Sequence, residues 1–568
     1  MKSPVYILGT GLSHNGSAVL LKDGRICVGI EKERLSRKKH DGGNDSLAIQ
    51  YCLDTEGITL DDVTLVVQCA NFEIPKRNYY NGKRIFSESN LPEVINISHH
   101  LAHAYSAVGT CPFDECNVMV IDGCGSPLDQ FLEIHPEQKD FIEKAFLNQT
   151  EMVCEKDSFY HFNGKKLIPL VKDFSKMSDL KNNTFSLPTT EHSIGGFYAA
   201  ISNYVFGDMD DVGKLMGLAP YGNPGVFKSE AFEFVDNSLF VKDNWKQEFT
   251  NPSKGYEYFK QNFEYYANVA YWAQEQVEKA ILECIGNRIG KFYHKNLCYS
   301  GGVALNAVAN ALLEDSRISE NLYLEPAAAD NGLALGCAFY GWIEYLGMTK
   351  VTHDGSTCFG KKYTDKDISE AITNNQTENT SNQIFSNETD LLEYCAKKLV
   401  DGKTIGWFQS GCEFGPRSLG RRSILAHPGI EGMKDHINLN IKFREDFRPF
   451  APAVLKNKVG EYFINGRNSP YMILVDKTRP EFISKLCNVT HRNGSARVQT
   501  VEKDWNLLFN RLLEEFYKQS GIAVVLNTSL NKKGMPIVET PQEAIDLFKI
   551  TALDILVMEN YVLEKRTS

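Results

Sequence analysis

VYILGTGLSHNGSAVLLKDGRICVGIEKE, from Val5 to Glu33, has the pattern of a buried strand, a Gly/Ser turn and a further strand. VMVIDGCGSPLDQFLEIHP, from Val118 to Pro136, repeats that order of strand, turn and strand. Such turns are expected where backbone N–H groups must approach a phosphate. The repeated pattern therefore predicts two related α/β halves within one domain.

Two halves of this kind, each followed by helices, predict the duplicated ribonuclease-H-like architecture of the actin/hexokinase superfamily, although short strand signals are common. Within Ala267–Ile289, apolar residues recur at i, i+4 spacing, which is typical of an amphipathic helix packed on a core. KNLCYSGGVALNAVANALLE follows and predicts a strand, a Gly-Gly turn and a helix from about Ala304.

The composition changes after about Thr349. Residues 349–387 are polar and rich in Asn, Thr, Asp and Ser, which indicates a connecting segment. LLEYCAKKLVDG then predicts a helix and TIGWFQSG a strand. We therefore expect an α/β (and α+β) protein with a domain at 1–348, a connection at 349–387 and a second domain at 388–568.

Bulk properties exclude several classes of protein. The 568 residues carry a formal net charge of -11, which argues against a general nucleic-acid binder. The N-terminus shows no apolar leader, and the apolar run Gly332–Ile343 is too short to span a bilayer. The 14 cysteines form no CxxC pair. We expect a cytoplasmic protein with reduced thiols that binds neither nucleic acid nor a membrane.

EVINISHHLAHAYSA is the first candidate site. If a strand ends near Ile97 and Ser98 caps a helix, His99 and His103 lie on one helix face, an arrangement common in metal binding. His100 complicates the assignment because it is shifted by one residue. For an arbitrary HxxxH sequence, two surface or core histidines are the commoner explanation.

Asp122, in VIDGCG, and Asp330, in AAADNG, lie in turns that the predicted fold brings together. Two imidazoles and two carboxylates with open positions suit Fe(II), Mn(II) or a similar ion better than structural zinc. The alternative for each aspartate is a helix cap or turn residue. Gly301 and Gly302 in SGGVALN would let the backbone approach an adenosine or phosphate, and Asn306 could contact a ribose or base.

The C-terminal region holds a dense set of cations despite the acidic total. They interleave with Gly, Pro and Phe on predicted loops, which favours a pocket for more than one phosphate. Scattered surface ion pairs with Glu445 and Asp446 are the alternative. The cations are Arg417, Arg421, Arg422, Lys442, Arg444, Arg448, Arg497, Lys532 and Lys533.

Four motifs occur in the order found in one enzyme family: HHLAHA, GKLMGLAPYG (Gly213–Gly222), SGGVALN and AADNGLALG. Together with HNGSAVLLKDGRI and EKERLSRKKH, they resemble the carbamoyltransferases that include the tobramycin, cephamycin and nodulation-factor enzymes. The resemblance covers nearly the whole chain. The N-terminal part is also similar to the tRNA threonylcarbamoyl transferases, and the C-terminal part resembles YrdC-like domains.

The resemblance implies roles for residues of the N-terminal domain. His99, His103, Asp122 and Asp330 match the metal ligands of the family, where the ion is usually iron (Fe2+). His14 matches a histidine beside the carbamoyl acceptor, and a neutral imidazole can take a proton from an attacking hydroxyl. Apart from the resemblance, the basic sequence RKKH offers Lys39 and His40 as contacts to acceptor or phosphate, with a solvated basic loop as the equal alternative. The adenylate would lie against Gly123, Gly301, Gly302, Asn306 and Asn331.

In the C-terminal domain, the resemblance implies that carbamoyl phosphate and ATP, with Mg2+, are converted to carbamoyl adenylate. The implied binding residues are Arg417, Lys442, Arg444, Arg448, Arg497, Ser529 and Asn531. The carbamoyl group would then pass, in the N-terminal domain, to a hydroxyl of a small-molecule natural product. The family implies a homodimer.

Three alternatives stay open. A tRNA threonylcarbamoyl-adenylate enzyme shares both domain types, but the net charge and GKLMGLAPYG argue against it. A hydrogenase-maturation carbamoyltransferase would be expected to have paired CxxC zinc fingers. An actin-like ATPase or sugar kinase would leave the C-terminal cations unexplained.

Overall fold

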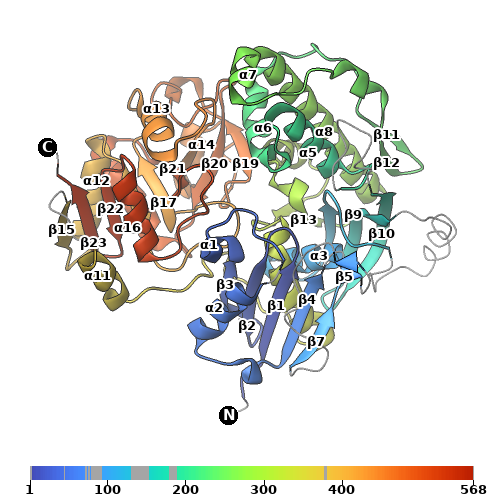
Figure 1. Ribbon diagram of the computed structural model, residues 1–568, viewed down its shortest axis with the longest axis horizontal. Coiled ribbons are helices and arrows are strands. Elements are labelled where there is room, and N and C mark those ends of the chain that lie inside the picture. The colour runs from blue at the N-terminus through green and yellow to red at the C-terminus, as the bar shows by residue number, and fades with distance from the viewer. Residues whose placement is uncertain are drawn as a thin grey trace. The chain divides into compact units, whose positions relative to one another are not determined.

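The computed structural model describes residues 3–43, 45–70, 73–74, 77–78, 92–128, 152–177, 189–375 and 380–566. The chain divides into two compact units (Figure 1). The first comprises residues 1–32 and 40–353, and the second comprises residues 33–39 and 354–568. A short N-terminal segment is therefore part of the second unit.

The first unit contains two five-stranded sheets with the orders β3-β2-β1-β4-β7 and β10-β9-β8-β13-β14. Numbered within each sheet, both orders read 3-2-1-4-5. The first three strands of each sheet are antiparallel and the last two run parallel to the first. The strands of these sheets are β1 (Tyr6–Leu12), β2 (Ser17–Lys22), β3 (Arg25–Glu31), β4 (Leu65–Ala70), β7 (Glu93–Asn96), β8 (Cys116–Ile121), β9 (Val153–Phe162), β10 (Leu167–Lys176), β13 (Asn296–Ser300) and β14 (Asn321–Leu324).

This repeated order confirms the predicted duplication and the actin/hexokinase-like class of the N-terminal domain. β1 and β8 are buried along their whole length, which explains why their sequences are nearly continuous apolar runs. The second strand expected within 118–136 falls in part on residues outside those described. The strand that pairs with β8 is β9.

Helices pack tightly at the centre of the first unit. A Cβ on Gly336 would lie 1.7 Å from the carbonyl oxygen of Ala102, so the backbones of two helices touch there. The helices of this unit are α2 (Ser46–Glu56), α3 (His99–Thr110), α5 (Ile194–Phe206), α6 (Val212–Leu218), α7 (Tyr256–Gln261), α8 (Phe263–Lys291), α9 (Ala307–Asp315) and α10 (Leu333–Tyr340). The contact at Gly336 joins α10 to α3, the helix that carries the paired histidines.

Helix predictions in this unit are largely confirmed. The amphipathic pattern of 267–289 is α8, whose Val277 and Ile281 are buried. The helix expected from about Ala304 begins at Ala307, because the short turn η5 (Gly302–Leu305) precedes it. Two short two-stranded sheets complete the unit, formed by β5 (Glu73–Ile74) with β6 (Arg77–Asn78) and by β11 (Phe232–Val235) with β12 (Ser238–Val241).

The second unit is built on a nine-stranded mixed sheet of order β15-β23-β22-β16-β17-β21-β18-β20-β19. Its strands are β15 (Thr380–Ile384), β16 (Ile405–Phe408), β17 (Arg422–Ala426), β18 (Ala451–Leu455), β19 (Leu474–Lys477), β20 (Ser495–Val501), β21 (Val524–Ser529), β22 (Ile555–Met558) and β23 (Tyr561–Lys565). Its helices are α1 (Lys32–Ser36), α11 (Asp365–Thr373), α12 (Glu388–Val400), α13 (Met433–Ile437), α14 (Val459–Tyr462), α15 (Leu507–Ser520) and α16 (Pro541–Ile550).

The predicted helix and strand after residue 388 are α12 and β16. The predicted connecting segment, 349–387, contains α11 and β15, and β15 pairs with β23 at the edge of the sheet. From Asp354 onward this segment is part of the second unit. In the part of the chain that the structure describes, no helix combines the length and apolar character needed to cross a membrane.

Candidate active site

The helix α3 places two histidines on one face. It starts at His99 after the N-cap Ser98, as the sequence predicts, and all of its residues are buried. The i, i+4 spacing brings the Nε2 atoms of His99 and His103 to 3.1 Å. Both imidazoles therefore face the same point.

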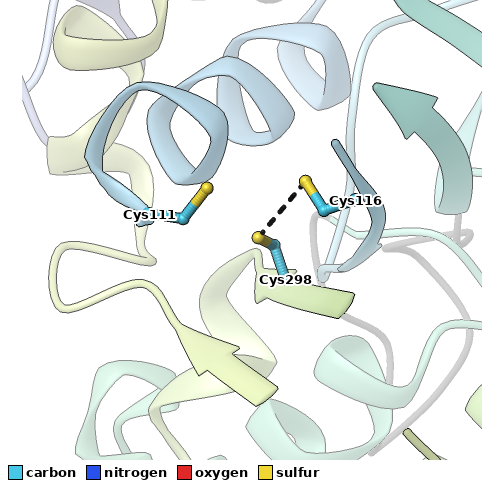
Figure 2. Close-up of side chains that lie close together, drawn as sticks. All are labelled: Cys111, Cys116 and Cys298. Carbon is cyan, nitrogen blue, oxygen red and sulfur yellow. Dashed lines mark hydrogen bonds between the residues drawn. The ribbon is translucent and has the colours of Figure 1, made fainter. Parts of the chain in front are cut away.

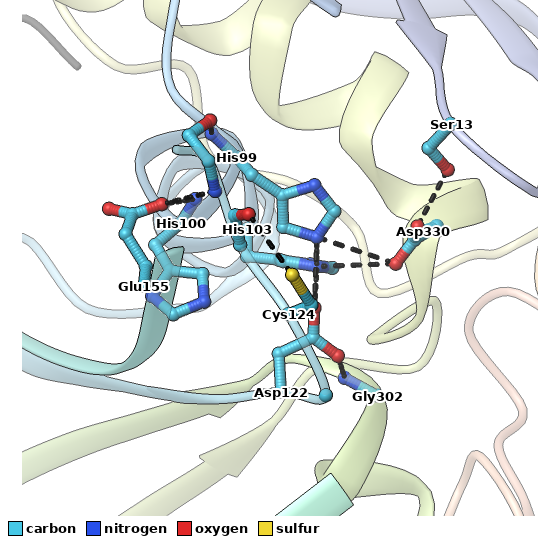
Figure 3. A network of polar contacts seen from close by, with 12 residues as sticks. Ser13, His99, His100, His103, Asp122, Cys124, Glu155, Gly302 and Asp330 are labelled. Carbon is cyan, nitrogen blue, oxygen red and sulfur yellow. Dashed lines mark hydrogen bonds and ion pairs between the residues drawn. The ribbon is translucent and has the colours of Figure 1, made fainter. Parts of the chain in front are cut away.

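Two carboxylates lie at that point (Figure 3). Asp122, directly after β8, has its Oδ2 2.9 Å from Nε2 of His99 and 3.7 Å from Nε2 of His103. Asp330, which opens the turn η6 (Asp330–Gly332), has its Oδ1 3.5 and 3.7 Å from the same nitrogens. The structure thus brings together all four residues predicted as metal ligands.

This donor set fits a divalent cation. Its ligand atoms all lie within 4.8 Å of one another. Bonds of about 2.1 Å to nitrogen and oxygen place neighbouring ligands of an octahedron about 3 Å apart. The His99–His103 and His99–Asp122 separations match such edges. Two imidazoles and two carboxylates suit iron or manganese, and they leave positions open for a substrate.

The electrostatics of the cluster are those of tightly paired charges. Burial lowers the pKa of His99, but the charge of Asp330 and hydrogen bonding to Asp122 outweigh it and raise that pKa well above its usual value. Burial raises the pKa of Asp122, but hydrogen bonds from His103 and His99 outweigh it and lower that pKa. The opposite shifts of His99 and Asp122 show that each of these buried groups stabilises the charged form of the other.

His100 points away from this cluster (Figure 3). Its Nδ1 lies 2.8 Å from Oγ of Ser158, and its backbone N–H donates to Glu155. Burial lowers the pKa of His100 to about 4, so the ring is neutral at physiological pH. The one-residue shift in register therefore excludes His100 from the four-residue cluster.

His14 adjoins the cluster from the loop between β1 and β2. Its Nδ1 lies 2.9 Å from Oδ2 of Asp330, and Oγ of Ser13 donates to the same oxygen at 2.6 Å. Burial lowers the pKa of His14, but the charge and hydrogen bond of Asp330 outweigh it and raise that pKa to about 9. The ring is therefore protonated at neutral pH in this structure, which differs from the neutral imidazole expected from the sequence.

Lys39 and His40, the other two residues predicted to be catalytic, belong to different units. His40 stacks near His14, with ring centroids 6.4 Å apart, and its Nδ1 lies 3.0 Å from Oδ1 of Asn15. Lys39 belongs to the second unit, where its charge is one of those that lower the pKa of Lys442. Lys39 and His40 are adjacent in sequence but lie in different units.

The predicted adenylate residues line the turns around Asp122. The N–H of Gly302 donates to Oδ1 of Asp122 at 3.2 Å. Gly301 has φ +91°, and a Cβ there would lie 2.3 Å from the carbonyl oxygen of Ile121. Packing against the end of β8 therefore requires a glycine at position 301.

Asn306 and Asn331 are engaged within the protein. Asn306 caps α9 by accepting from the N–H of Ala309, and its amide exchanges two hydrogen bonds with Gln274. The Nδ2 of Asn331 donates to Oε1 of Glu31 at 2.5 Å. These contacts hold the turns in place, and a direct contact of either amide with adenylate stays a prediction.

One element beside Gly123 was missed by sequence reasoning. The hydroxyls of Thr189, Thr190 and Ser193 all donate to the carbonyl oxygen of Gly123. Ser193 is also the N-cap of α5, where its Oγ accepts from the N–H of Gly196. The sequence Ser-Ile-Gly-Gly before an apolar run could have indicated this element. A serine at that position can cap the start of a helix, and the two glycines leave room for close packing.

Lys442 is the centre of the second site. It is buried at the end of the short π-helix η8 (Asn438–Lys442), and its Nζ lies 2.6 Å from Oδ1 of Asn531 and 3.1 Å from Oγ of Ser529. Burial and then the charges of Arg444, Arg448 and Lys39 lower its pKa well below the usual value. The ammonium therefore lies among other cations.

Four arginines complete this cation cluster, which we define as Arg417, Lys442, Arg444, Arg448 and Arg497. Burial and the charge of Arg448 lower the pKa of Arg417 to about 10. Burial and then the charges of Arg417, Arg444 and Arg448 lower the pKa of Arg497. The Nε atoms of Arg417 and Arg497 are buried and have no hydrogen-bond acceptor among the described residues. Cations so placed favour an anionic ligand.

Other predicted cations have structural roles. Arg422 is buried, stacks 3.5 Å from the ring centroid of Phe408, and donates to the carbonyl oxygen of Gln409. The Nζ of Lys533 lies 2.6 Å from Oε1 of Glu445. At Lys533 the structure therefore shows the ion pair with Glu445 that the sequence left open as an alternative. Arg497 lies in β20, although the sequence predicted a loop there.

Family models describe the chain. The model "Carbamoyltransferase N-terminus" matches residues 6–79 and 71–339, and the model "Carbamoyltransferase C-terminus" matches residues 396–565. The chain belongs to the carbamoyltransferase family. The recognition made from HHLAHA and GKLMGLAPYG is thereby confirmed, and this protein is a carbamoyltransferase.

Relatives of this carbamoyltransferase match it along most of its length. The 3'-hydroxymethylcephem-O-carbamoyltransferase of Amycolatopsis lactamdurans is 26% identical and covers 92% of each chain. Nodulation protein NolNO of Sinorhizobium fredii is 29% identical over 98% of this chain and 79% of its own. Among solved structures, HypF of T. kodakarensis covers 61% of this chain and 49% of its own, with 15% identity and a TM-score of 0.40.

Proposed function

We propose that this carbamoyltransferase is an ATP-dependent O-carbamoyltransferase. Its second unit would convert carbamoyl phosphate and ATP to carbamoyl adenylate, and its first unit would transfer the carbamoyl group to a hydroxyl of a small-molecule natural product. The name of the Amycolatopsis relative, an O-carbamoyltransferase, supports the acceptor class. The observation that carries the proposal is the cation cluster around Lys442.

The cluster suits the first reaction because its two reactants are both anionic. Carbamoyl phosphate and ATP repel each other, so several cations in a partly dehydrated pocket are needed to hold them together. Arg417 and Arg497 offer donors that the protein itself leaves unused. In the proposed step, carbamoyl phosphate loses phosphate by hydrolysis, and an oxygen of the resulting carbamate attacks the α-phosphorus of ATP. Pyrophosphate leaves, and Mg2+ would accompany the nucleotide.

The transfer step would take place beside the cluster of two histidines and two aspartates. A cation held by His99, His103, Asp122 and Asp330 would supply positive charge for the adenylate oxygens. His14 would take the proton of the acceptor hydroxyl, whose oxygen forms a bond to the carbamoyl carbon while the bond to AMP breaks. Ser13 would keep Asp330 oriented through its 2.6 Å hydrogen bond.

Two variants test the division of labour. Arg448→Ala should lose most of the carbamoyl-phosphate-dependent release of pyrophosphate. His14→Ala should keep that release and lose the transfer of carbamoyl to an acceptor, measured by mass spectrometry over a panel of hydroxylated metabolites. Transfer at the wild-type rate by His14→Ala would contradict the role of His14.

The same assays separate the alternatives. Release of pyrophosphate driven by threonine and bicarbonate, instead of carbamoyl phosphate, would favour a threonylcarbamoyl-adenylate enzyme. Formation of ADP, instead of AMP, would favour a kinase or actin-like ATPase. A gain of one carbamoyl group on one compound would identify the acceptor.

A further inference from the structure

Three buried cysteines meet at the end of α3 that lies away from its histidines (Figure 2). Cys111 directly follows the helix, Cys116 opens β8 and Cys298 lies in β13. All three are fully buried. Their sulfur atoms lie within 4.8 Å of one another, and the sulfurs of Cys116 and Cys298 are 3.6 Å apart.

This thiol cluster is distinct from the site described above. At 1.5 Å per helical residue, Cys111 lies about 12 Å beyond His103 along the axis of α3. β8 and β13 are parallel neighbours in which Cys298 pairs with Val118. Because Cys116 is two positions before Val118, it shares a sheet face with Cys298. The central sheet thus fixes two of the sulfurs, and the short turn after α3 brings the third to them.

The spacing fits a single metal ion. A zinc–sulfur bond is about 2.3 Å, so sulfurs around one ion are about 3.8–4.0 Å apart in tetrahedral or trigonal arrangements. The 3.6 Å between the sulfurs of Cys116 and Cys298 is close to this range, and the sulfur of Cys111 lies within 4.8 Å of both. Soft thiolates select zinc and related ions over magnesium, calcium or manganese.

The ammonium of Lys350 lies beside the sulfurs and determines which charge of metal ion would balance the site. Nζ of Lys350 lies 3.4 Å from Sγ of Cys111 and donates to the carbonyl oxygens of Cys111 and Phe113 at 2.8 and 2.6 Å. Three thiolates and one ammonium carry two net negative charges. A divalent cation balances them, whereas a monovalent one leaves a buried charge, which is costly.

We infer that Cys111, Cys116 and Cys298 form a second metal site, which binds one divalent cation of the zinc type through three thiolates. The ion would clamp the C-terminal end of α3 to β8 and β13. Because His99 and His103 lie on the same helix, the bound ion would stabilise the position of that helix without contacting either histidine. This inference does not depend on the proposed carbamoyl-adenylate reaction.

Cobalt provides the probe because its bonds to thiolates give charge-transfer absorption in the near ultraviolet, which histidine and carboxylate ligands do not. The full chain, produced in medium containing Co2+, should show this absorption. X-ray absorption at the metal edge should find a component with three sulfur neighbours and one lighter donor. Structural zinc sites usually have four donors, so the lighter one completes the set.

Variants assign the signal. Cys116→Ser and Cys298→Ser should lose the absorption and bind about one equivalent less metal than the wild-type chain. Cys284→Ser, at another buried cysteine of the same unit that lies outside the cluster, should keep both. If a cluster variant fails to fold, the spectra of the wild-type chain still decide, since they require no substitution.

Three results would overturn the inference. The first is the absence of cobalt–thiolate absorption in the wild-type chain. The second is equal metal content in the wild type and in a folded Cys298→Ser variant. The third is an intact mass and peptide map showing that Cys116 and Cys298 are joined as a disulfide in the freshly isolated protein.

Discussion

The Nε2 atoms of His99 and His103 lie 3.1 Å apart and face the carboxylates of Asp122 and Asp330. No covalent constraint holds two imidazole nitrogens so close. The i, i+4 spacing on α3 brings the two imidazoles together. The turns that end β8 and precede α10 bring the two carboxylates to them. A shared cation is the simplest partner for all four groups, because each ligand atom can reach it.

His103→Asn should therefore lower the affinity of the first unit for Fe2+ or Mn2+ by at least about 10-fold, since one of four ligands is lost. Titration calorimetry and metal analysis measure the change. His100→Asn is the matched control on the same helix, because His100 faces Ser158 and not the cluster. Equal metal affinity in His103→Asn and the wild type would exclude His103 as a ligand.

Proton uptake should accompany the binding of an anion at Lys442. Burial and neighbouring arginines lower the pKa of Lys442 in the free protein, and a bound phosphate oxygen would raise it again. A group whose pKa rises on binding takes up a proton, so affinity falls as the pH increases. Calorimetry of pyrophosphate binding in buffers of different ionisation enthalpy measures the uptake, after correction for the protonation of pyrophosphate itself.

Lys442→Met should bind pyrophosphate more weakly and lose its share of the uptake. Lys456→Met is the control, because Lys456 is a half-exposed lysine paired with Glu502 elsewhere in the second unit. Affinity that rises with pH in the wild type would contradict the assigned position of Lys442 in the anion site.

Part of the fold could be predicted because it depends on local patterns of sequence. The continuous apolar runs of β1 and β8, and the capping position of Ser98, depend on neighbours in sequence. Local pattern alone does not distinguish Arg417 from Arg422, because both are arginines of one short segment, and only the family resemblance singled out Arg417. Their roles differ because Arg422 enters β17, stacks on Phe408 and donates to the carbonyl oxygen of Gln409, whereas Arg417 precedes the strand and lies near the charge of Arg448.

Other features depend on contacts between distant segments. Lys39 follows α1, and its membership in the second unit results from tertiary packing. Arg37, nearby, donates to the carbonyl oxygens of Pro536 and Ile537, almost 500 residues later. Cys116 and Cys298 are 182 residues apart in sequence. No pattern within a window of sequence could indicate these meetings.

Glu155 and Lys172 form a buried ion pair, with Nζ 2.5 Å from Oε1 and neither side chain exposed. Removing one partner leaves an uncompensated buried charge, so Glu155→Gln and Lys172→Met should each destabilise the fold by about 3–5 kcal/mol. The double variant should be less destabilised than the sum of the two. Chemical denaturation of the four proteins measures the coupling energy, and simple additivity would contradict the pairing.

The same pair should make stability sensitive to acid. Burial raises the pKa of Glu155, but the charge of Lys172 outweighs it, and the pKa falls to about 2. A carboxyl with a depressed pKa contributes stability that is present above its unfolded value, near 4.5, and lost as the pH falls toward 2. Glu155→Gln should therefore lose less stability than the wild type between pH 5 and about 3. Loss of the exposed Lys366–Glu370 pair, as a control, should cost less than about 1 kcal/mol.

Two glycines of GKLMGLAPYG should respond oppositely to alanine. A Cβ on Gly222 would lie 2.2 Å from the carbonyl oxygen of Ala267, within α8, and the backbone cannot easily withdraw. Gly222→Ala should therefore destabilise the fold by about 1–3 kcal/mol or more. Gly213 lies within α6 with nothing near its missing Cβ, so Gly213→Ala should be neutral or stabilise by up to about 1 kcal/mol. Thermal unfolding compares the two, and an unchanged Tm in Gly222→Ala would contradict the close approach of this motif to α8.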